Sequence, residues 1–185
     1  MITLRPFLLI IIVLFFSGCF WSTPKNVLTP KAAFGIPTGQ IINREAFLKG
    51  GTLVVLPFKA GEDAMANPQL DRVALMLAKG VIDYLDEQRT PYQVLTTQDQ
   101  GRPQMIIDGY IHDFNRPGRI SRWIFRNKQT RLRISGQMVL SDGKERVMVF
   151  QADKSLADPK RDGLDVAYQT GQDLGRFIVD ALNDD

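Results

Sequence analysis

Cysteine and histidine, two residue types that serve as nucleophiles, bases and metal ligands, occur once each in this 185-residue chain, as Cys19 and His112. A nucleophile works beside a general base, and a zinc site takes three or four protein ligands. His112 has no second histidine to complete such a site, and Cys19 belongs to the signal sequence described next. We therefore expect His112 to have a structural role. We also expect the protein to hold no metal or cofactor and to be no enzyme.

Cys19 follows an apolar run near the start of the chain. The run extends from Phe7 to Phe16, comes after Arg5, and ends at the small residues Ser17 and Gly18. As a helix it would rise about 15 Å, roughly half of a bilayer core, so it is too short to span a membrane. A basic residue, a short apolar core and small residues behind it are typical of a secretory signal peptide. Cleavage would make Cys19 the first residue of the mature protein.

The residues Phe16-Ser17-Gly18-Cys19 resemble the lipobox of bacterial lipoproteins, which usually has Leu where Phe16 stands. The resemblance implies a diacylglyceryl thioether on Cys19 and an acyl chain such as palmitate on its amino group. One acyl chain binds a membrane marginally, and further chains make the anchor stable. Phe20 stands where retained inner-membrane lipoproteins often carry Asp, so the resemblance favours the outer membrane, facing the periplasm. An ordinary secretory signal with an incidental cysteine is the alternative.

We divide the chain into three parts. Residues 1–18 are the signal peptide, residues 19–50 a lipid-anchored tether interrupted by prolines and glycines, and residues 51–185 a periplasmic α/β domain. The mature chain has no second cysteine, so it must hold together by burial, without an internal disulfide. Within the tether, Phe47 and its apolar neighbours are expected to pack on the domain.

The hydrophobic pattern of residues 51–185 predicts the order β-α-β-β-β-β-α. The strands are expected at 52–58, 92–96, 104–114, 130–140 and 145–152, and the helices from the N-cap Asn67 and over about 162–182. The β-α-β order favours a parallel pairing of the first two strands, and Asp142-Gly143 predicts a hairpin turn between the last two. The fold class is an α/β two-layer sandwich, with a mixed sheet of about five strands and two helices on one face.

Two details of this arrangement bear on function. On strand 104–114, His112 would share a face with Tyr110 and Phe114. Gly171 and Gly175 are four residues apart on the apolar face of the last helix, and this spacing is expected to allow a close approach to the sheet.

The stretch from Arg116 to Arg133 holds seven basic residues and no acidic one. Aromatic side chains flanked by arginine suit either lipid headgroups or a protein interface, whereas a solvated loop with one hydrophobic anchor is the alternative. Nucleic acid is not expected, because the signal sequence exports the chain. The residues assigned to this contact are Arg119, Arg122, Trp123, Ile124, Phe125, Arg126 and Lys128. The acidic last helix offers a complementary surface, so a head-to-tail homo-oligomeric ring is a hypothesis.

The order of segments, with Val55-Leu56-Pro57-Phe58 and Asp108-Gly109-Tyr110-Ile111 as its motif-like parts, resembles several envelope proteins. These are the curli-secretion lipoprotein, lipoprotein activators of peptidoglycan synthases, the Pel-polysaccharide secretion lipoprotein and the amino-terminal domain of TolB. The resemblance covers roughly residues 51–182. It implies a non-enzymatic accessory protein of a cell-envelope secretion or assembly machine, in contact with an envelope protein partner or channel.

The chain also departs from these groups. Its tether is shorter than that of the synthase activators, and no segment is long enough for the membrane hairpins of the curli channel. Separately, Ile124-Phe125-Arg126-Asn127 and Gln129-Thr130 resemble the lipoprotein plug of the lipopolysaccharide-export barrel. A role as that plug or assembly factor, or as a synthase activator, therefore stays open beside the secretion role.

Overall fold

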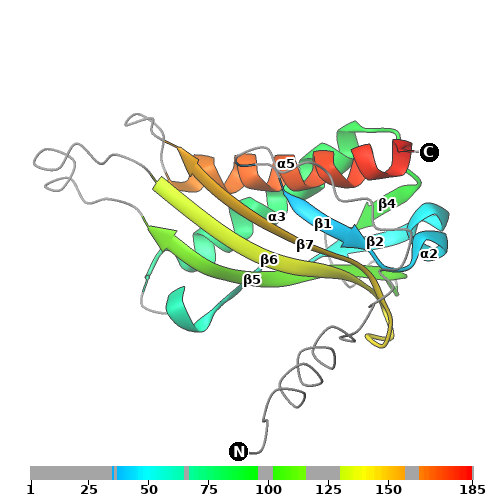
Figure 1. The fold of residues 1–185 in the computed structure, drawn as a ribbon, viewed down its shortest axis with the longest axis horizontal. Coiled ribbons are helices and arrows are strands. Elements are labelled where there is room, and N and C mark those ends of the chain that lie inside the picture. Colours follow the sequence, from blue (N-terminus) through cyan, green and yellow to red (C-terminus); the bar gives the residue numbers. More distant parts are fainter. Residues whose placement is uncertain are drawn as a thin grey trace, which may run out of the picture.

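The computed structural model describes residues 35, 37–64, 67–95, 102–115, 130–156 and 163–184. They form one mixed sheet with two long helices on one side of it (Figure 1). The strands are β1 (Thr38–Ile41), β2 (Gly51–Val55), β3 (Lys59–Ala60), β4 (Tyr92–Leu95), β5 (Met105–Asn115), β6 (Thr130–Leu140) and β7 (Arg146–Leu156). The helices are α2 (Arg44–Lys49), the 3-10 helix η1 (Glu62–Ala64), α3 (Leu70–Glu87) and α5 (Gly163–Asn183).

The predicted α/β architecture is confirmed, but the expected five strands and two helices were too few. Strand β1 and helix α2 lie in the segment assigned to the tether, and β1 pairs antiparallel with β7. The side chain of Asn43 caps α2, accepting a hydrogen bond from the Ala46 N–H at 2.9 Å, and Phe47 is fully buried. The residues from Thr38 onward therefore belong to the folded unit, and Phe47 packs on it as expected.

The strands lie in the order β1-β7-β6-β5-β2-β4, and the short β3 pairs with β5. Strands β2 and β4 are parallel, as the β-α-β order predicted. Strands β5, β6 and β7, each of 11 residues, form an antiparallel meander. The predicted turn after β6 is present: Gly143 has φ of +69°, and the Asp142 carboxylate accepts a hydrogen bond from the Lys144 N–H at 3.0 Å. This turn sets the register of β6 against β7.

Helices α3 and α5 pack against each other on one face of the sheet. The contact is closest where Gly171 of α5 meets Gly80 of α3: a Cβ at Gly171 would lie 2.1 Å from the carbonyl oxygen of Leu77. A Cβ at Gly175 would likewise meet the side chain of Tyr84 in α3. The prediction that these glycines approach the sheet was therefore wrong. The pattern identified the buried face of α5, but periodicity does not say which element faces it.

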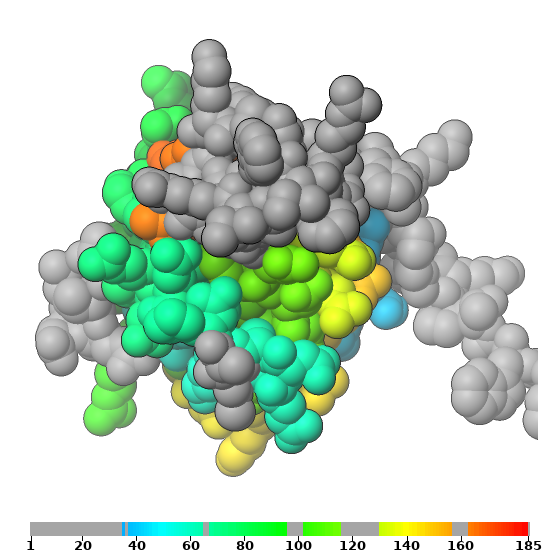
Figure 2. Space-filling model, turned by 90° about the vertical axis from the view of Figure 1, so that its left-hand side faces the viewer, coloured from blue at the N-terminus to red at the C-terminus, as the bar shows by residue number. Residues whose placement is uncertain are grey.

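Helix α3 begins at Leu70, later than the predicted N-cap Asn67 implies. Asn67 instead closes the turn ahead of the helix, accepting a hydrogen bond from the Gln69 N–H at 3.0 Å. Its amide also donates to the carbonyl oxygen of Phe114 at 3.2 Å, which holds this turn against β5. Figure 2 views this end of the molecule and shows the segment containing β3 and η1 lying against β5.

The core lies between the helices and the sheet. Its largest fully buried side chains include Leu53, Leu77, Ile107, Met138, Met148 and Leu174, contributed by both layers. Tyr92 extends this core toward α2, because its hydroxyl donates to the Phe47 carbonyl oxygen at 2.6 Å. None of the helices in the described part of the chain is long and apolar enough to cross a membrane.

Candidate functional site

The sheet face opposite α3 and α5 carries a hollow. On β5, β6 and β7, residues that point to the helices alternate with residues that point away from them. Phe58 and Phe150 belong to the core cluster, with their ring centroids 6.1 Å apart. The residues that alternate with Phe150 therefore lie on the opposite side, which we call the open face.

Strand register arranges the side chains of the open face in two rows, polar except for Val149, that cross four strands. The first row consists of Tyr110, Ser135, Gln151 and Thr38, which are successive partners on β5, β6, β7 and β1. The second row consists of Asp108, Gln137, Val149 and Gln40 on the same four strands. Residues that are far apart in the sequence, such as Thr38 and Gln151, thus lie side by side.

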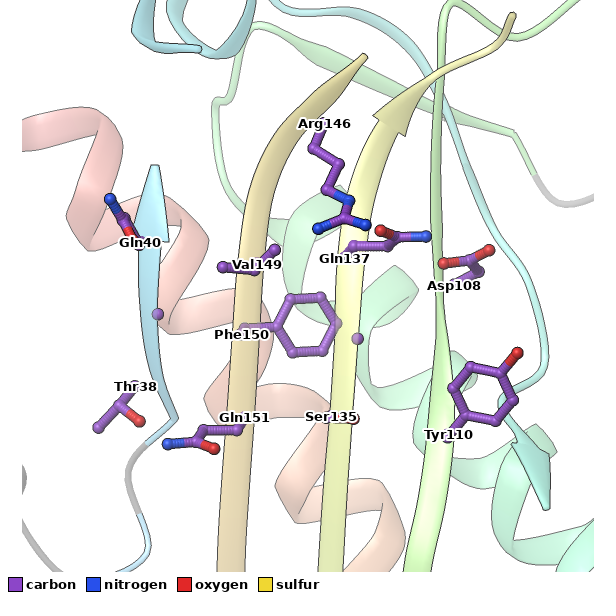
Figure 3. Close-up of a pocket in the computed structure, with 12 residues that line it drawn as sticks. Thr38, Gln40, Asp108, Tyr110, Ser135, Gln137, Arg146, Val149, Phe150 and Gln151 are labelled. Atoms are coloured by element: carbon purple, nitrogen blue, oxygen red, sulfur yellow. The ribbon is translucent and has the colours of Figure 1, made fainter. Parts of the chain in front are cut away.

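The two rows line a hollow of about 650 Å³. Figure 3 shows these side chains on the strands, with the helices behind the sheet. Arg146, at the start of β7, extends over the sheet toward Gln137, and Asp108 lies on the other side of Gln137. Tyr110 stands at one side of the hollow with 50% of its surface exposed, unusually high for an aromatic residue. The hollow therefore combines amides, hydroxyls, one carboxylate, one guanidinium and an exposed ring.

His112 lies at the border of this hollow because of an irregularity in β5. The pairing of β5 with β6 shifts between Ile111 and Asp113, so His112 has no opposite residue. After the shift Phe114 is buried, so it does not share the face of Tyr110 and His112 as the sequence predicted. The Nε2 atom of His112 lies 2.6 Å from the Ser135 Oγ, within hydrogen-bond distance.

A histidine beside a serine is only part of a nucleophilic site. Ser135 is half-buried in the middle of β6, rather than on a turn that would expose its hydroxyl to a substrate carbonyl. Among the described residues, no group of three or more His, Cys, Asp or Glu side chains could hold a metal ion. The geometry of the His112–Ser135 pair thus supports a positioning role beside Tyr110.

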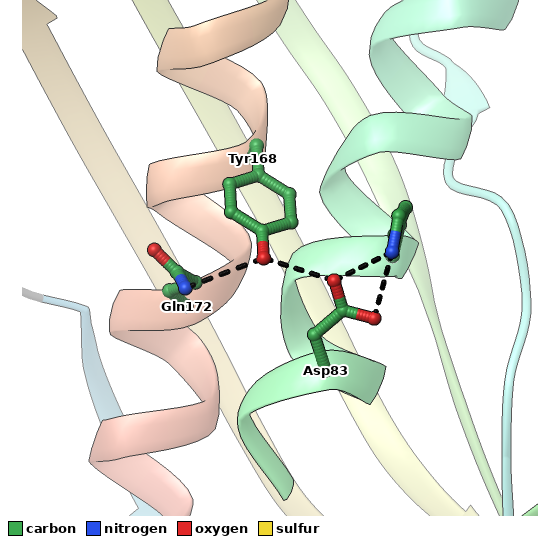
Figure 4. A network of polar contacts seen from close by, with 4 residues as sticks. Asp83, Tyr168 and Gln172 are labelled. Carbon is green, nitrogen blue, oxygen red and sulfur yellow. Dashed lines mark hydrogen bonds and ion pairs between the residues drawn. The ribbon is translucent and has the colours of Figure 1, made fainter. Parts of the chain in front are cut away.

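The opposite surface, formed by α3 and α5, carries a polar network (Figure 4). The Tyr168 hydroxyl donates to Asp83 at 2.9 Å across the two helices, and the Lys79 ammonium donates to the same carboxylate. Partial burial acts to raise the pKa of Asp83, but the hydrogen bonds from Lys79 and Tyr168 outweigh it, so this pKa lies below its usual value. The hydrogen bond to Asp83 raises the pKa of Tyr168. This network holds the two helices together where their backbones are closest.

The structure does not place the contact residues that were assigned from the sequence. Cys19, Arg119, Arg122, Trp123, Ile124, Phe125, Arg126 and Lys128 all lie outside the described residues. The end of the basic stretch is described, and there Arg131 and Arg133 are exposed on β6. Arg131 makes a two-point ion pair with Asp153 of β7, so this positive charge is compensated within the sheet.

The acidic residues of the last helix are also partly compensated by the protein itself. Lys154 of β7 forms an ion pair with Asp173 of α5, which joins the sheet to the helix layer. Arg176 lies 3.9 Å from the same carboxylate. The proposed attraction between a basic stretch and this helix therefore depends on Asp180 and Asp184 more than on Asp173.

The open-face residues were not predicted as a site from the sequence. The predicted strand boundaries for β6 and the predicted Asp142-Gly143 turn were sufficient to pair β6 with β7, and this pairing places Ser135 beside Gln151. Two features needed to predict the hollow could not be found from the sequence: strand β1, which completes the two rows, and the register shift at His112, which forms the border.

Comparisons of the sequence with protein-family models and with curated proteins found no match. Among solved structures, the fold is similar to that of a PelC dodecamer from Paraburkholderia phytofirmans, with 7% identity and a TM-score of 0.51 over 77% of this chain and 96% of that chain. Lipoprotein GNA1162 from Neisseria meningitidis has 9% identity and a TM-score of 0.44 over 74% of this chain and 100% of that chain. The similarity to PelC agrees, at the level of the fold, with the resemblance to the Pel-secretion lipoprotein; a likeness to the amino-terminal domain of TolB is not confirmed.

Proposed function

We propose that this chain is a lipid-anchored, non-enzymatic accessory protein of a cell-envelope secretion or assembly machine. In this proposal Cys19 carries the lipid, the anchor lies in the outer membrane, and the α/β domain faces the periplasm. Residues 20–37 then connect the anchor to the sheet, which the chain enters at β1. At about 3.3 Å per extended residue, this connection reaches up to about 60 Å from the membrane surface.

The observation that carries the proposal is the combination of a lipobox-like sequence with this fold. The fold is shared with PelC, which is described as a dodecamer. A closed ring of identical copies requires two different patches on each copy, one for each neighbour. We therefore propose that the anchored chains assemble into a homo-oligomeric ring that contacts an envelope partner.

The anchor is tested by comparing the full chain with its Cys19→Ala variant in a bacterial host. Expected results are that radiolabelled palmitate enters only the wild-type protein and that only the wild-type protein sediments with outer-membrane vesicles after a salt wash. Cys19→Ala should be lost from the outer-membrane fraction, because the missing thioether removes the diacylglyceryl chains. Equal labelling and sedimentation of both proteins would refute the anchor.

The ring is tested separately, on the wild-type chain extracted in detergent. Light scattering after size-exclusion chromatography should give a protein mass that is a multiple of the mature chain and independent of dilution. A mass equal to one chain at all concentrations would refute the ring while leaving the anchor in place.

A further inference from the structure

We infer that the hollow on the open face binds a neutral, polyhydroxylated chain, that is, an oligosaccharide. This inference goes beyond the proposed function, which assigns the chain an anchor and neighbours but no ligand. It depends on the hydrogen-bonding character, charge and exposure of the side chains in the two polar rows.

Most of the hydrogen-bonding side chains of the hollow can both donate and accept. Gln40, Gln137 and Gln151 each offer a carbonyl oxygen and an amino group, and the Ser135 hydroxyl can do both. A sugar hydroxyl has the same double character, so it can donate a hydrogen bond to one of these groups and accept one from another. The rows present such groups at the spacing of neighbouring strands, about 4.8 Å, over the width of several strands.

The charge of the hollow favours an uncharged ligand. Among the described residues that line it, one carboxylate, Asp108, and one guanidinium, Arg146, carry charge, and their charges cancel. Asp108 would repel an anionic ligand, and Arg146 would repel a cationic one. Either ligand would also lose its hydration without gaining a net opposite charge in the hollow. Both groups can instead hydrogen-bond to neutral hydroxyls, which charged groups do more strongly than neutral ones.

Tyr110 supplies a flat apolar surface at the side of the hollow. Its side chain is half exposed, and its neighbour Ser135 lies within hydrogen-bond distance of His112. The ring of a tyrosine offers an apolar face together with a polar hydroxyl, which suits the C–H face and the rim of a sugar ring. Protein sheets are known to present oligosaccharide sites on strand faces of this kind.

Two other occupants fit the hollow less well. An extended peptide adds to a sheet at an unpaired edge, whereas β6 and β7 are paired on both sides. A second copy of the chain would need an apolar interface core, and among the described residues that line the hollow Tyr110 is the one large apolar side chain that is exposed. The volume of about 650 Å³ lies within the usual range of small-ligand sites, roughly 300–1,000 Å³.

The test is isothermal titration calorimetry of the lipidated full chain in a detergent without a sugar headgroup. The probes are cellohexaose and chitohexaose, two neutral hexasaccharides, with inorganic triphosphate as the anionic comparison. We expect both hexasaccharides to bind at micromolar to millimolar concentrations and triphosphate to give no saturable heat. Tyr110→Ala and Gln137→Ala should each weaken the binding about tenfold, because Tyr110→Ala removes a stacking face and Gln137→Ala removes a hydrogen-bonding amide.

The matched control is Gln93→Ala, which removes an exposed amide from β4, outside the hollow. It should bind the hexasaccharides as the wild-type chain does, and all variants should keep the wild-type circular dichroism and Tm. Absence of binding by a folded wild-type chain would overturn the inference, as would unchanged binding by Tyr110→Ala. A Tyr110→Ala variant with normal binding but a smaller oligomer mass would show that the face contacts a second copy instead.

Discussion

Replacing Gly171 by alanine tests the close approach of α5 to α3. The added Cβ would lie 2.1 Å from the carbonyl oxygen of Leu77 and 3.0 Å from the Cα of Gly80. These are backbone atoms of α3, so the clash cannot be relieved by turning a side chain, and the two helices must separate by more than an ångström. Overpacking of this kind lowers the free energy of unfolding by up to about 3 kcal/mol, while the better helix propensity of alanine raises it by about 1 kcal/mol. We therefore expect Gly171→Ala to lower the free energy of unfolding by about 2 kcal/mol.

The measurement is urea unfolding of the full chain, followed by circular dichroism at 222 nm, with a thermal scan beside it. A loss of about 2 kcal/mol corresponds to a fall in Tm of about 4–8 °C for a chain of this size. Gln169→Ala, on the same helix and half-buried, is the control, and it should stay within about 0.5 kcal/mol of the wild-type protein. If Gly171→Ala were as stable as the wild-type protein or more stable, the close packing of α3 on α5 would be wrong.

Three further predictions concern the α2 contact and the titrating groups. Phe47→Ala should lower the free energy of unfolding by about 3–5 kcal/mol in urea, because Phe47 is fully buried; no change would mean that residues 38–49 do not belong to the folded unit. Burial raises the pKa of Tyr92, so its neutral hydroxyl stabilises the fold below the unfolded pKa of about 10, and this stability is lost as the pH rises beyond it. Tyr92→Phe should lower the free energy of unfolding by about 1–2 kcal/mol at pH 7, because the Phe47 carbonyl oxygen loses its hydrogen-bond donor. Between pH 10 and 12 the Tm of Tyr92→Phe should fall less than the Tm of the wild-type chain. The pKa of Asp83 is lowered on balance, so its contribution is present above the unfolded pKa of about 3.9 and is lost as the pH falls through the folded pKa. The Tm of Asp83→Asn should therefore fall less on acidification from pH 5 to pH 2, and an unchanged acid profile would contradict this assignment.

Much of the fold could be predicted from local patterns. The alternation of Leu132, Ile134 and Met138 gave the bounds of β6, and Asp142-Gly143 gave the turn that follows it. Strand β1 could not be found in this way, because Thr38-Gly39-Gln40-Ile41 has one apolar residue and depends on pairing with β7. The partner of Gly171 was missed for a related reason, since a helix pattern identifies a buried face without identifying the element that covers it.

The candidate site was harder to predict than the fold. Its side chains come from four strands, and only their register places Tyr110, Ser135 and Gln151 in one row. No residue type marks the shift after Ile111, although this shift decides that Phe114 is buried and that His112 reaches Ser135. The sequence analysis instead singled out Cys19 and the residues around Trp123, because a signal motif and a basic aromatic run are visible without any tertiary information.

The two outermost strands, β1 and β4, each have four residues, whereas the three strands of the meander have 11. An unpaired strand edge is a template on which another chain can form cross-β aggregates, and the hazard grows with the length of the edge. Molecules held on one membrane by lipid would meet at far higher local concentration than molecules in solution. Short outer strands limit the fusion of neighbouring sheets under this crowding, so the chain could be concentrated on a surface without seeding amyloid-like fibres.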